Sequence, residues 1–279
     1  MKKSILLSGL FALYLMAAMP ANAQLFNKLK DKVKQQANKA VDKVLDKDDS
    51  NTSTPADNIT SENTTKLFKD AAQAYDFHAG TTAFFSDNFS EDSLGSMAKS
   101  WKTSGSGAVQ AFPDGDGRWL SLKEFTSYKL RSDKPLPQNF TVEFDIVTHS
   151  NTSASDLEAL SFGFAHDNNI SDYISDAYND GAITATQSNY WNKEINNSSS
   201  DTKINNSIKF PLAQYAIGKM HVAIAVNGNN MRVYLDKVKV LDTEMFLNSS
   251  KNKYFYISTS TRLDNGARIG IGDFSIAAL

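Results

Sequence analysis

Two acidic residues two positions apart are the most direct candidates for chemistry in this chain. Glu143 and Asp145 alternate with the apolar residues Val142, Phe144 and Ile146. In a strand, their carboxylates would therefore project from one face, about 7 Å apart. Carboxylates at this separation can act as the acid and the base or nucleophile of glycosidic cleavage. The same alternation also arises on the solvated face of a sheet with no catalytic role, which is the interpretation we favour.

A second acidic group suits a metal better than acid–base work. Asp114 and Asp116 alternate with Gly115 and Gly117, and carboxylate oxygens are ligands that calcium prefers. Asp and Gly are equally the residues of a hairpin turn. Because calcium takes roughly six to eight oxygens, these residues supply at most part of a site. We expect either no cofactor or calcium.

A polar stretch rich in Asn, Ser and Asp, residues 167–207, carries the aromatic side chains best suited to stacking on a ligand. They are Tyr173, Tyr190 and Trp191. Flat aromatic faces with a polar handle can stack on a sugar ring, and a loop this long in a compact domain is typically functional. We expect an exposed binding surface here, whereas Trp101 and Trp119 lie in apolar segments and should be core.

Composition excludes several classes of protein. A net charge of −2 and a pI near 6.1 argue against nucleic-acid binding, which depends on clustered cations. The chain has no cysteine, so disulfides, thiolate metal sites and a Cys nucleophile are excluded. Its sequence contains no nucleophile elbow, P-loop or dinucleotide fingerprint.

The acidic pair belongs to the clearest strand in the chain, residues 138–148, where apolar and polar residues alternate between turn signals. Most of the chain from residue 81 onward shows similar short strands separated by turn residues, which indicates an all-β sandwich. The expected strands are 81–85, 101–103, 108–112, 119–122, 127–130, 140–148, 160–165, 220–226, 231–235, 238–241, 254–259 and 268–277. Gly228, within an Asn-rich turn, marks the clearest hairpin.

The N-terminal part has a different organisation. Residues 1–23 have the charged, apolar and small-residue parts of a Sec signal peptide. Residues 24–47 show helical apolar spacing with seven lysines between Lys28 and Lys47, which predicts an amphipathic helix for peripheral membrane contact or self-association, or simply a lysine-solvated helix. The composition of residues 48–75 predicts a polar, flexible linker, and we expect the sandwich to occupy residues 76–279.

Three landmarks in a fixed order carry a family resemblance. They are Phe-Ser-Asp-Asn-Phe at 85–89 followed by Leu94, Gly95 and Trp101, Asn-Phe-Thr-Val-Glu-Phe-Asp-Ile at 139–146, and Met-Arg-Val-Tyr-Leu-Asp at 231–236. Together they resemble the concanavalin A-like, laminin-G-like jelly-roll superfamily of lectins and glucanases. The resemblance implies an antiparallel jelly roll that binds carbohydrate. Related glucanases show Glu-x-Asp-x-Glu where this chain has Val147 in the third position, and Lys237 stands where laminin-G-like hairpins usually have Gly.

The signal peptide, lysine-rich helix, spacer and first landmark together resemble the N-terminal half of Bacteroidota outer-membrane OmpA-family proteins. Those proteins usually continue into a peptidoglycan-binding domain, and this chain ends on the last expected strand. Peptidoglycan anchoring is therefore not carried over.

These features predict an exported, non-enzymatic protein that is periplasmic, outer-membrane-associated or secreted. Its sandwich would recognise a glycan or an envelope protein. Two alternatives stay open: a glycoside hydrolase or lyase using Glu143 and Asp145, and a structural envelope protein anchored by residues 24–47.

Overall fold

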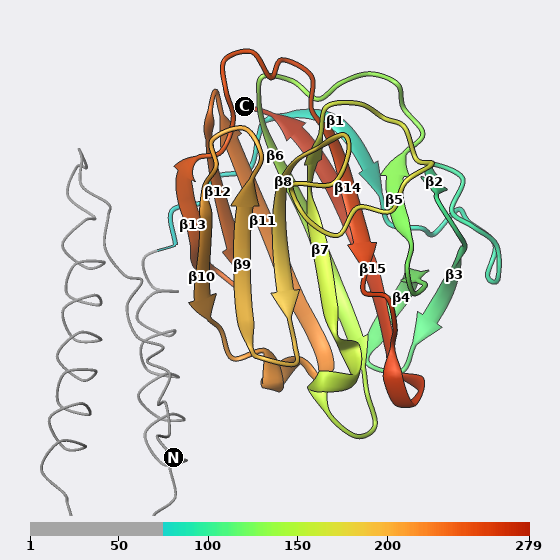
Figure 1. Ribbon diagram of the computed structural model, residues 1–279. Coiled ribbons are helices and arrows are strands. Elements are labelled where there is room, and N and C mark those ends of the chain that lie inside the picture. Colours follow the sequence, from blue (N-terminus) through green and yellow to red (C-terminus); the bar gives the residue numbers. More distant parts are fainter. Residues whose placement is uncertain (1–74) are drawn as a thin grey trace, which may run out of the picture. The chain divides into compact units, whose positions relative to one another are not determined.

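The computed structural model describes residues 75–279 as a sandwich of two antiparallel sheets (Figure 1). The predicted signal peptide (1–23), the lysine-rich helix (24–47) and all of the linker (48–75) except its last residue lie outside the described residues. Within the described part, no helix has the length and apolar content needed to cross a bilayer.

The first sheet, sheet A, contains the acidic strand near its centre. Its order is β13 (Val238–Glu244), β12 (Asn230–Leu235), β11 (Ile217–Asn227), β6 (Asn139–His149), β15 (Arg268–Ala278), β4 (Gly115–Leu122) and β3 (Gly107–Phe112), with β1 (Thr82–Asp87) also paired to β15. The first and last strands of the sandwich are therefore neighbours, and the C-terminus lies beside β1 (Figure 1).

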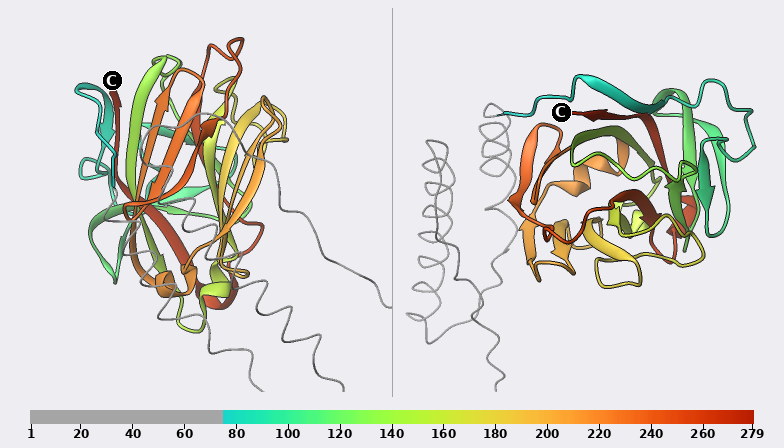
Figure 2. Two further views of the ribbon diagram at one scale, coloured as in Figure 1. Left: turned by 90° about the vertical axis from the view of Figure 1, so that its left-hand side faces the viewer. Right: turned by 90° about the horizontal axis from the view of Figure 1, so that it is seen from above.

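Sheet B forms the second layer. Its order is β10 (Asn205–Lys209), β9 (Glu194–Ser199), β8 (Ala182–Asn189), β7 (Ala159–Ala165), β14 (Tyr254–Thr259), β5 (Ser127–Leu130) and β2 (Trp101–Thr103). Three short 3₁₀ turns complete the described elements: η1 (Ala154–Leu157), η2 (Leu212–Tyr215) and η3 (Asp264–Gly266). Figure 2 shows the two layers from the side and from above.

The core fills the gap between the sheets, as the alternation in β6 predicts. Val142, Phe144 and Ile146 are each 0% exposed. The Phe144 ring lies 5.4 Å from Phe162 and 5.6 Å from Phe255, both on sheet B. Burial of such side chains is the main favourable term in folding, so β6 joins the two layers.

All twelve strands predicted from the sequence are present, with ends shifted by a few residues at most. The prediction of one long loop over residues 167–207 is corrected, because β8, β9 and the start of β10 lie within it. Their inward-facing side chains are largely polar, so the sequence there shows no apolar alternation.

Two tight turns show how local sequence sets strand register. Asn227 pairs with Asn230, and Gly228 between them has φ 60°, which confirms the predicted hairpin. In the next hairpin, Asp236 and Lys237 form the loop with φ values of 44° and 71°. Lys237 therefore adopts the left-handed conformation that favours glycine.

The outer faces of the two sheets are covered differently. Part of the polar stretch lies over sheet B, where the backbone N–H of Ile174 donates to Ser127 Oγ at 2.8 Å and the buried Lys129 donates to the Asp167 carbonyl at 3.0 Å. On sheet A, Tyr75 and Phe77 pack against Tyr234 of β12. A cavity lies on another part of sheet A, at β4 and β15.

Candidate functional site

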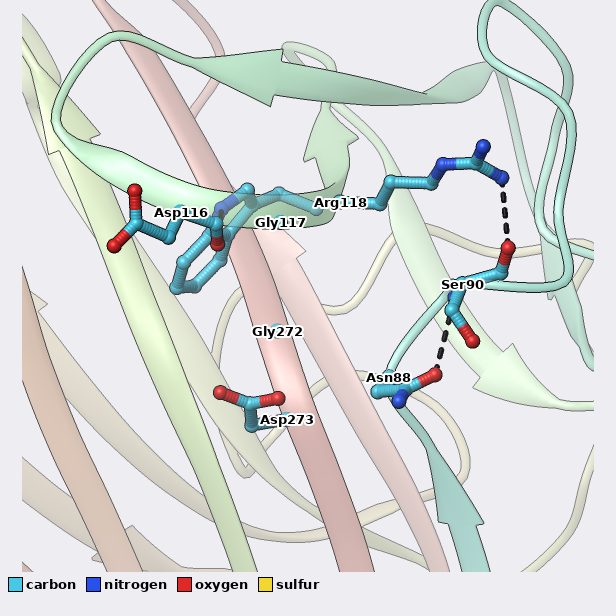
Figure 3. A pocket seen from close by; sticks show the side chains of 8 residues that line it. Asn88, Ser90, Asp116, Gly117, Arg118, Gly272 and Asp273 are labelled. Atoms are coloured by element: carbon cyan, nitrogen blue, oxygen red, sulfur yellow. Dashed lines mark hydrogen bonds between the residues drawn. The ribbon is translucent and has the colours of Figure 1, made fainter.

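A cavity of about 340 Å³ opens between β4, β15 and the segment that follows β1 (Figure 3). Hydrogen-bonding side chains predominate in its lining, which consists of Asn88, Ser90, Asp116, Gly117, Arg118, Trp119, Gly272 and Asp273. This volume falls in the range typical of small-molecule sites, so the cavity can hold a small polar ligand or one unit of a larger ligand.

A β-bulge in β15 places Asp273 in this cavity. Ile271 and Phe274 are both buried in the core, and the pairing with β6 shifts register between Gly272 and Ser275. The extra residue allows Asp273 to be exposed, with φ 48°. Bulges commonly redirect a side chain beside a functional site, and a non-glycine residue with positive φ is uncommon.

Trp119 forms the floor of the cavity. Its side chain is 2% exposed, and its Nε1–H donates to the Asp116 carbonyl at 3.1 Å. A Cβ on Gly272 would lie 2.6 Å from the indole and one on Gly115 would lie 2.8 Å from it. Both glycines are therefore needed for the ring to pack against the sheet. Burial of Trp119 confirms the sequence prediction, as does burial of Trp101 at 0% exposed.

The two carboxylates of the cavity are available to a ligand. Neither Asp116 nor Asp273 is hydrogen-bonded through its side chain within the described residues; both act electrostatically on Lys219. The Arg118 guanidinium extends away from them and donates to the Ser90 carbonyl at 2.8 Å, as Figure 3 shows. The cavity therefore offers carboxylate acceptors, and its nearest guanidinium is already engaged.

On the same face, His221 of β11 joins the predicted acidic pair. Its Nδ1 lies 2.7 Å from Asp145 Oδ1, and its Nε2 lies 3.5 Å from Glu143 Oε2. Lys219 Nζ lies 2.8 Å from Asp145 Oδ2. The imidazole donates to Asp145 and, more weakly, to Glu143, and these two carboxylate acceptors raise the pKa of His221 to about 9. An imidazolium is therefore held between two carboxylates at neutral pH.

This arrangement balances charge and does not prepare an acid. Burial opposes ionisation of Asp145, but hydrogen bonds from His221 and Lys219 outweigh it and lower its pKa. A glycosidase needs one carboxyl whose pKa is raised enough to protonate the leaving group. Asp145 therefore lacks the raised pKa that the acid of such a pair requires.

The structure places the two predicted calcium ligands in different surroundings. Asp114 Oδ2 lies 2.6 Å from His149 Nδ1, whereas Asp116 lines the cavity. In residues 75–279, no group of three or more His, Cys, Asp or Glu side chains is arranged to hold a metal ion.

The predicted ligand-binding aromatics are also separated. The expectation for Tyr190 is corrected: it is 0% exposed, packed in the main core, and presents no face to a ligand. Trp191 is 58% exposed in the β8–β9 turn. Tyr173 is partly buried, and its hydroxyl donates to the Thr259 carbonyl at 2.6 Å.

The sequence suggests Asp273 only as a calcium ligand facing Asp87, whose carboxylate instead accepts from Trp101 Nε1–H, and it does not single out Lys219 or His221. One signal for Asp273 was present, because Gly270 and Gly272 interrupt the last strand and glycine inside a strand often marks a bulge. Lys219 and His221 gave no separate signal. They reach Asp145 because β11 pairs with β6 in a register that sets His221 opposite Asp145.

Comparison of the structure with solved structures gives lectin-like sandwiches. The Emp47p carbohydrate recognition domain matches with a TM-score of 0.50 and 12% identity, over 69% of this chain and 94% of that one. Arcelin-5, a lectin-like defense protein from Phaseolus vulgaris, gives a TM-score of 0.48 and 12% identity, over 66% and 95%. The Ca²⁺-bound exoplasmic/lumenal domain of VIP36 gives 0.46 and 11% identity, over 68% and 88%.

No family model matches this sequence, and no curated protein matches it. The two antiparallel sheets of the structure and the similarity to the Emp47p domain show the fold, an antiparallel jelly-roll sandwich related to the concanavalin A-like class, and confirm the fold class predicted from the sequence. The resemblance of the N-terminal half to OmpA-family proteins stays a prediction.

Proposed function

We propose that this protein is a non-enzymatic glycan-binding protein whose site is the cavity on sheet A. The observation that carries the proposal is the bulge that turns Asp273 out of the core to face the same cavity as Asp116, with neither carboxylate bound by another side chain. Sugar hydroxyls donate strong, charge-assisted hydrogen bonds to carboxylates. The carbohydrate recognition domain of Emp47p, which has the same type of fold, supports this proposal.

Asn88 and Ser90 extend the donor and acceptor set of the cavity. The Asn88 side-chain oxygen accepts the backbone N–H of Ser90 at 3.0 Å, which fixes the amide and leaves its NH₂ for a ligand oxygen. A sugar hydroxyl can accept from this amide and donate to a carboxylate. Mixed polar groups of this kind suit a hydroxyl-rich ligand.

The test compares two substitutions, each of which replaces a residue with a positive φ by glycine. Asp273→Gly removes the carboxylate at φ 48°, and Lys237→Gly makes the same kind of change at φ 71° on the same sheet, in the β12–β13 turn. Glycine suits both backbones, so neither change should destabilise the fold. We expect Asp273→Gly to weaken glycan binding about 10- to 100-fold, the equivalent of losing a hydrogen bond to a charged group.

Binding is measured on a glycan array and then by calorimetry with the best glycan. Lys237→Gly should bind like the unmodified protein. The cavity proposal fails if no glycan is retained by the unmodified protein, or if Asp273→Gly binds as well as Lys237→Gly.

We also propose that the protein is exported to the cell envelope or beyond it, on the basis of residues 1–23, and that residues 24–47 attach it to an anionic surface or to a second copy. N-terminal sequencing of the mature protein should begin at Gln24. Liposome co-sedimentation with and without residues 24–47 tests attachment, and equal pelleting would exclude membrane docking.

A further inference from the structure

The cavity on sheet A carries a negative charge that its own lining does not neutralise. Asp116 and Asp273 are its acidic residues and Arg118 is its basic one, so two negative charges and one positive charge leave −1. The Arg118 guanidinium donates to the main-chain carbonyls of Ser90, at 2.8 Å, and Asp92. Figure 3 shows this guanidinium on the opposite side of the cavity from both carboxylates. The cavity therefore has one distinctly acidic side.

The neighbouring cations of sheet A do not supply the missing positive charge. Lys219 Nζ lies 2.8 Å from Asp145 Oδ2, and His221 lies between Asp145 and Glu143. Two cations and two carboxylates thus balance one another at neutral pH. The hydrogen bond to Asp145 raises the pKa of Lys219, and the charges of both cavity carboxylates raise it further. A positive charge near the cavity is therefore stabilised by these two carboxylates.

An ammonium group fits this acidic side better than a metal ion does. Calcium takes roughly six to eight oxygens, and in the described residues 75–279 no three His, Cys, Asp or Glu side chains are arranged to hold a metal. An ammonium group has three N–H donors and forms charge-assisted hydrogen bonds with carboxylates. Asp116 on β4 and Asp273 on β15 offer carboxylate acceptors from two different strands.

The rest of the lining suits a sugar better than the side chain of a protein lysine. The lysine ammonium stands on a four-carbon stem, which would need apolar surface to cover it. The Trp119 indole, the largest apolar group of the lining, is only 2% exposed. Asn88 and Ser90 instead offer hydrogen-bonding groups, and the Asn88 NH₂ can donate to a ring hydroxyl because its oxygen already accepts the Ser90 N–H.

We propose that the cavity selects a glycan unit that carries a free ammonium group, namely an amino sugar whose nitrogen is not acetylated. The ammonium group lies on the side of Asp116 and Asp273, and the ring hydroxyls lie toward Asn88. This proposal rests on the proposed glycan-binding function and adds the charge of the ligand to it. It accounts for two carboxylates that no side chain of the described residues neutralises by hydrogen bonding.

The test uses three sugars that differ only at C2: glucosamine with an ammonium group, N-acetylglucosamine with a neutral amide and glucose with a hydroxyl. Their galacto counterparts are measured in parallel, by calorimetry and NMR titration of the full chain at a pH where the sugar amine is protonated. In low salt, we expect an amino sugar to bind about 3- to 30-fold more tightly than its neutral counterparts, as two exposed ion pairs allow. High salt should reduce this preference, because it screens exposed charges.

Two substitutions remove the charge of the cavity while keeping the shape of its side chains. They are Asp116→Asn and Asp273→Asn, and asparagine tolerates the positive φ at position 273. Each should lower the preference for the amino sugar more than it weakens binding of the N-acetylated sugar. Asp133→Asn is the matched control, because the Asp133 side chain is 92% exposed and lies outside the cavity lining. This control should keep the full preference.

The ammonium proposal is overturned if neutral sugars bind as tightly as amino sugars, or if Asp273→Asn keeps the preference shown by Asp133→Asn. It is also overturned if calcium chloride or Nα-acetyl-lysine amide binds more tightly than the amino sugars. Equal binding of neutral and amino sugars that is lost in Asp273→Gly would leave the proposed glycan-binding function intact and remove only the selectivity. Absence of binding to every sugar would overturn both proposals.

Discussion

At the scale of one residue, His221 shows how a strand neighbour changes the surroundings of the acidic pair. Its imidazole lies between Glu143 and Asp145, and its pKa rises from 6.5 to about 9 because both carboxylates favour the protonated form. A carboxylate pair that looks catalytic in the sequence is therefore engaged with a cation from the neighbouring strand. Sequence spacing gave the distance between the carboxylates but not the residue that neutralises them.

This pairing predicts a defined pH dependence of stability. The pKa of His221 is higher in the folded chain than in the unfolded one. Its contribution to the free energy of unfolding is therefore complete below pH 6.5 and is lost as the pH rises to about 9. The side chain is 39% exposed, and solvent screening limits the contribution to about 1 kcal/mol. Urea unfolding across this range should show the loss, and His221→Gln should remove it. The prediction would be contradicted if the free energy of unfolding of His221→Gln fell with rising pH as steeply as that of the unmodified protein.

Asp145 acts in the opposite direction. Its pKa is lowered from 3.8 by the hydrogen bonds that overcome its burial, so its contribution is present above that value and is lost as the pH falls through the lowered pKa. The cluster of His221, Asp145 and Lys219 therefore stabilises the sheet most at pH values between the lowered pKa of Asp145 and the raised pKa of His221.

At the scale of elements, β8 and β9 pack through hydrogen bonds where other strands pack through apolar contact. Asn197 is 0% exposed; its Nδ2 donates to the Val240 carbonyl of sheet A at 3.2 Å, and its Oδ1 accepts from Thr186 Oγ1 at 2.8 Å. Ser199 Oγ donates to the Met245 carbonyl at 2.7 Å. These bonds join the two layers at the β10 and β13 side of the sandwich.

Replacing Asn197 by Ala should destabilise the protein by about 2–3 kcal/mol, because the Val240 carbonyl and the Thr186 hydroxyl lose buried partners. Chemical denaturation measures this change. Asn196→Ala on the adjacent residue is the control, since no hydrogen bond of the Asn196 side-chain oxygen is found. Equal costs for the two variants would show that the bonds of Asn197 contribute little.

The same polar packing explains which elements the sequence could predict. Strands such as β6 and β11 alternate apolar and polar residues. Both the strands and the faces that they bury could therefore be predicted from the sequence. In β8 and β9, inward positions hold Thr184, Thr186 and Asn197, and the pattern is typical of a loop. The Asp273 bulge was signalled only by Gly270 and Gly272, because one extra residue changes which side chain faces out without changing the composition of the strand.

At the scale of the whole molecule, a cluster of phenylalanines makes the two sheets one unit. Phe144 contacts Phe162 and Phe255 of sheet B and lies 5.9 Å from Phe274 of sheet A. Phe255 and Phe274 are themselves 5.1 Å apart. The proposed cavity is built on β4 and β15, and β15 carries Phe274 of this cluster, so the geometry of the cavity depends on this core.

Phe144→Ala should therefore destabilise the sandwich by about 3–5 kcal/mol, the usual cost of removing a fully buried Phe. Because the layers share the core, far-UV and near-UV signals should still be lost in one transition, shifted to lower denaturant concentration. Phe77→Ala tests the contrast: Phe77 packs on the outer face of sheet A in a small separate cluster, so its loss should cost less and leave the joint transition intact. Separate transitions for the two signals in Phe144→Ala would show that the sheets are energetically independent.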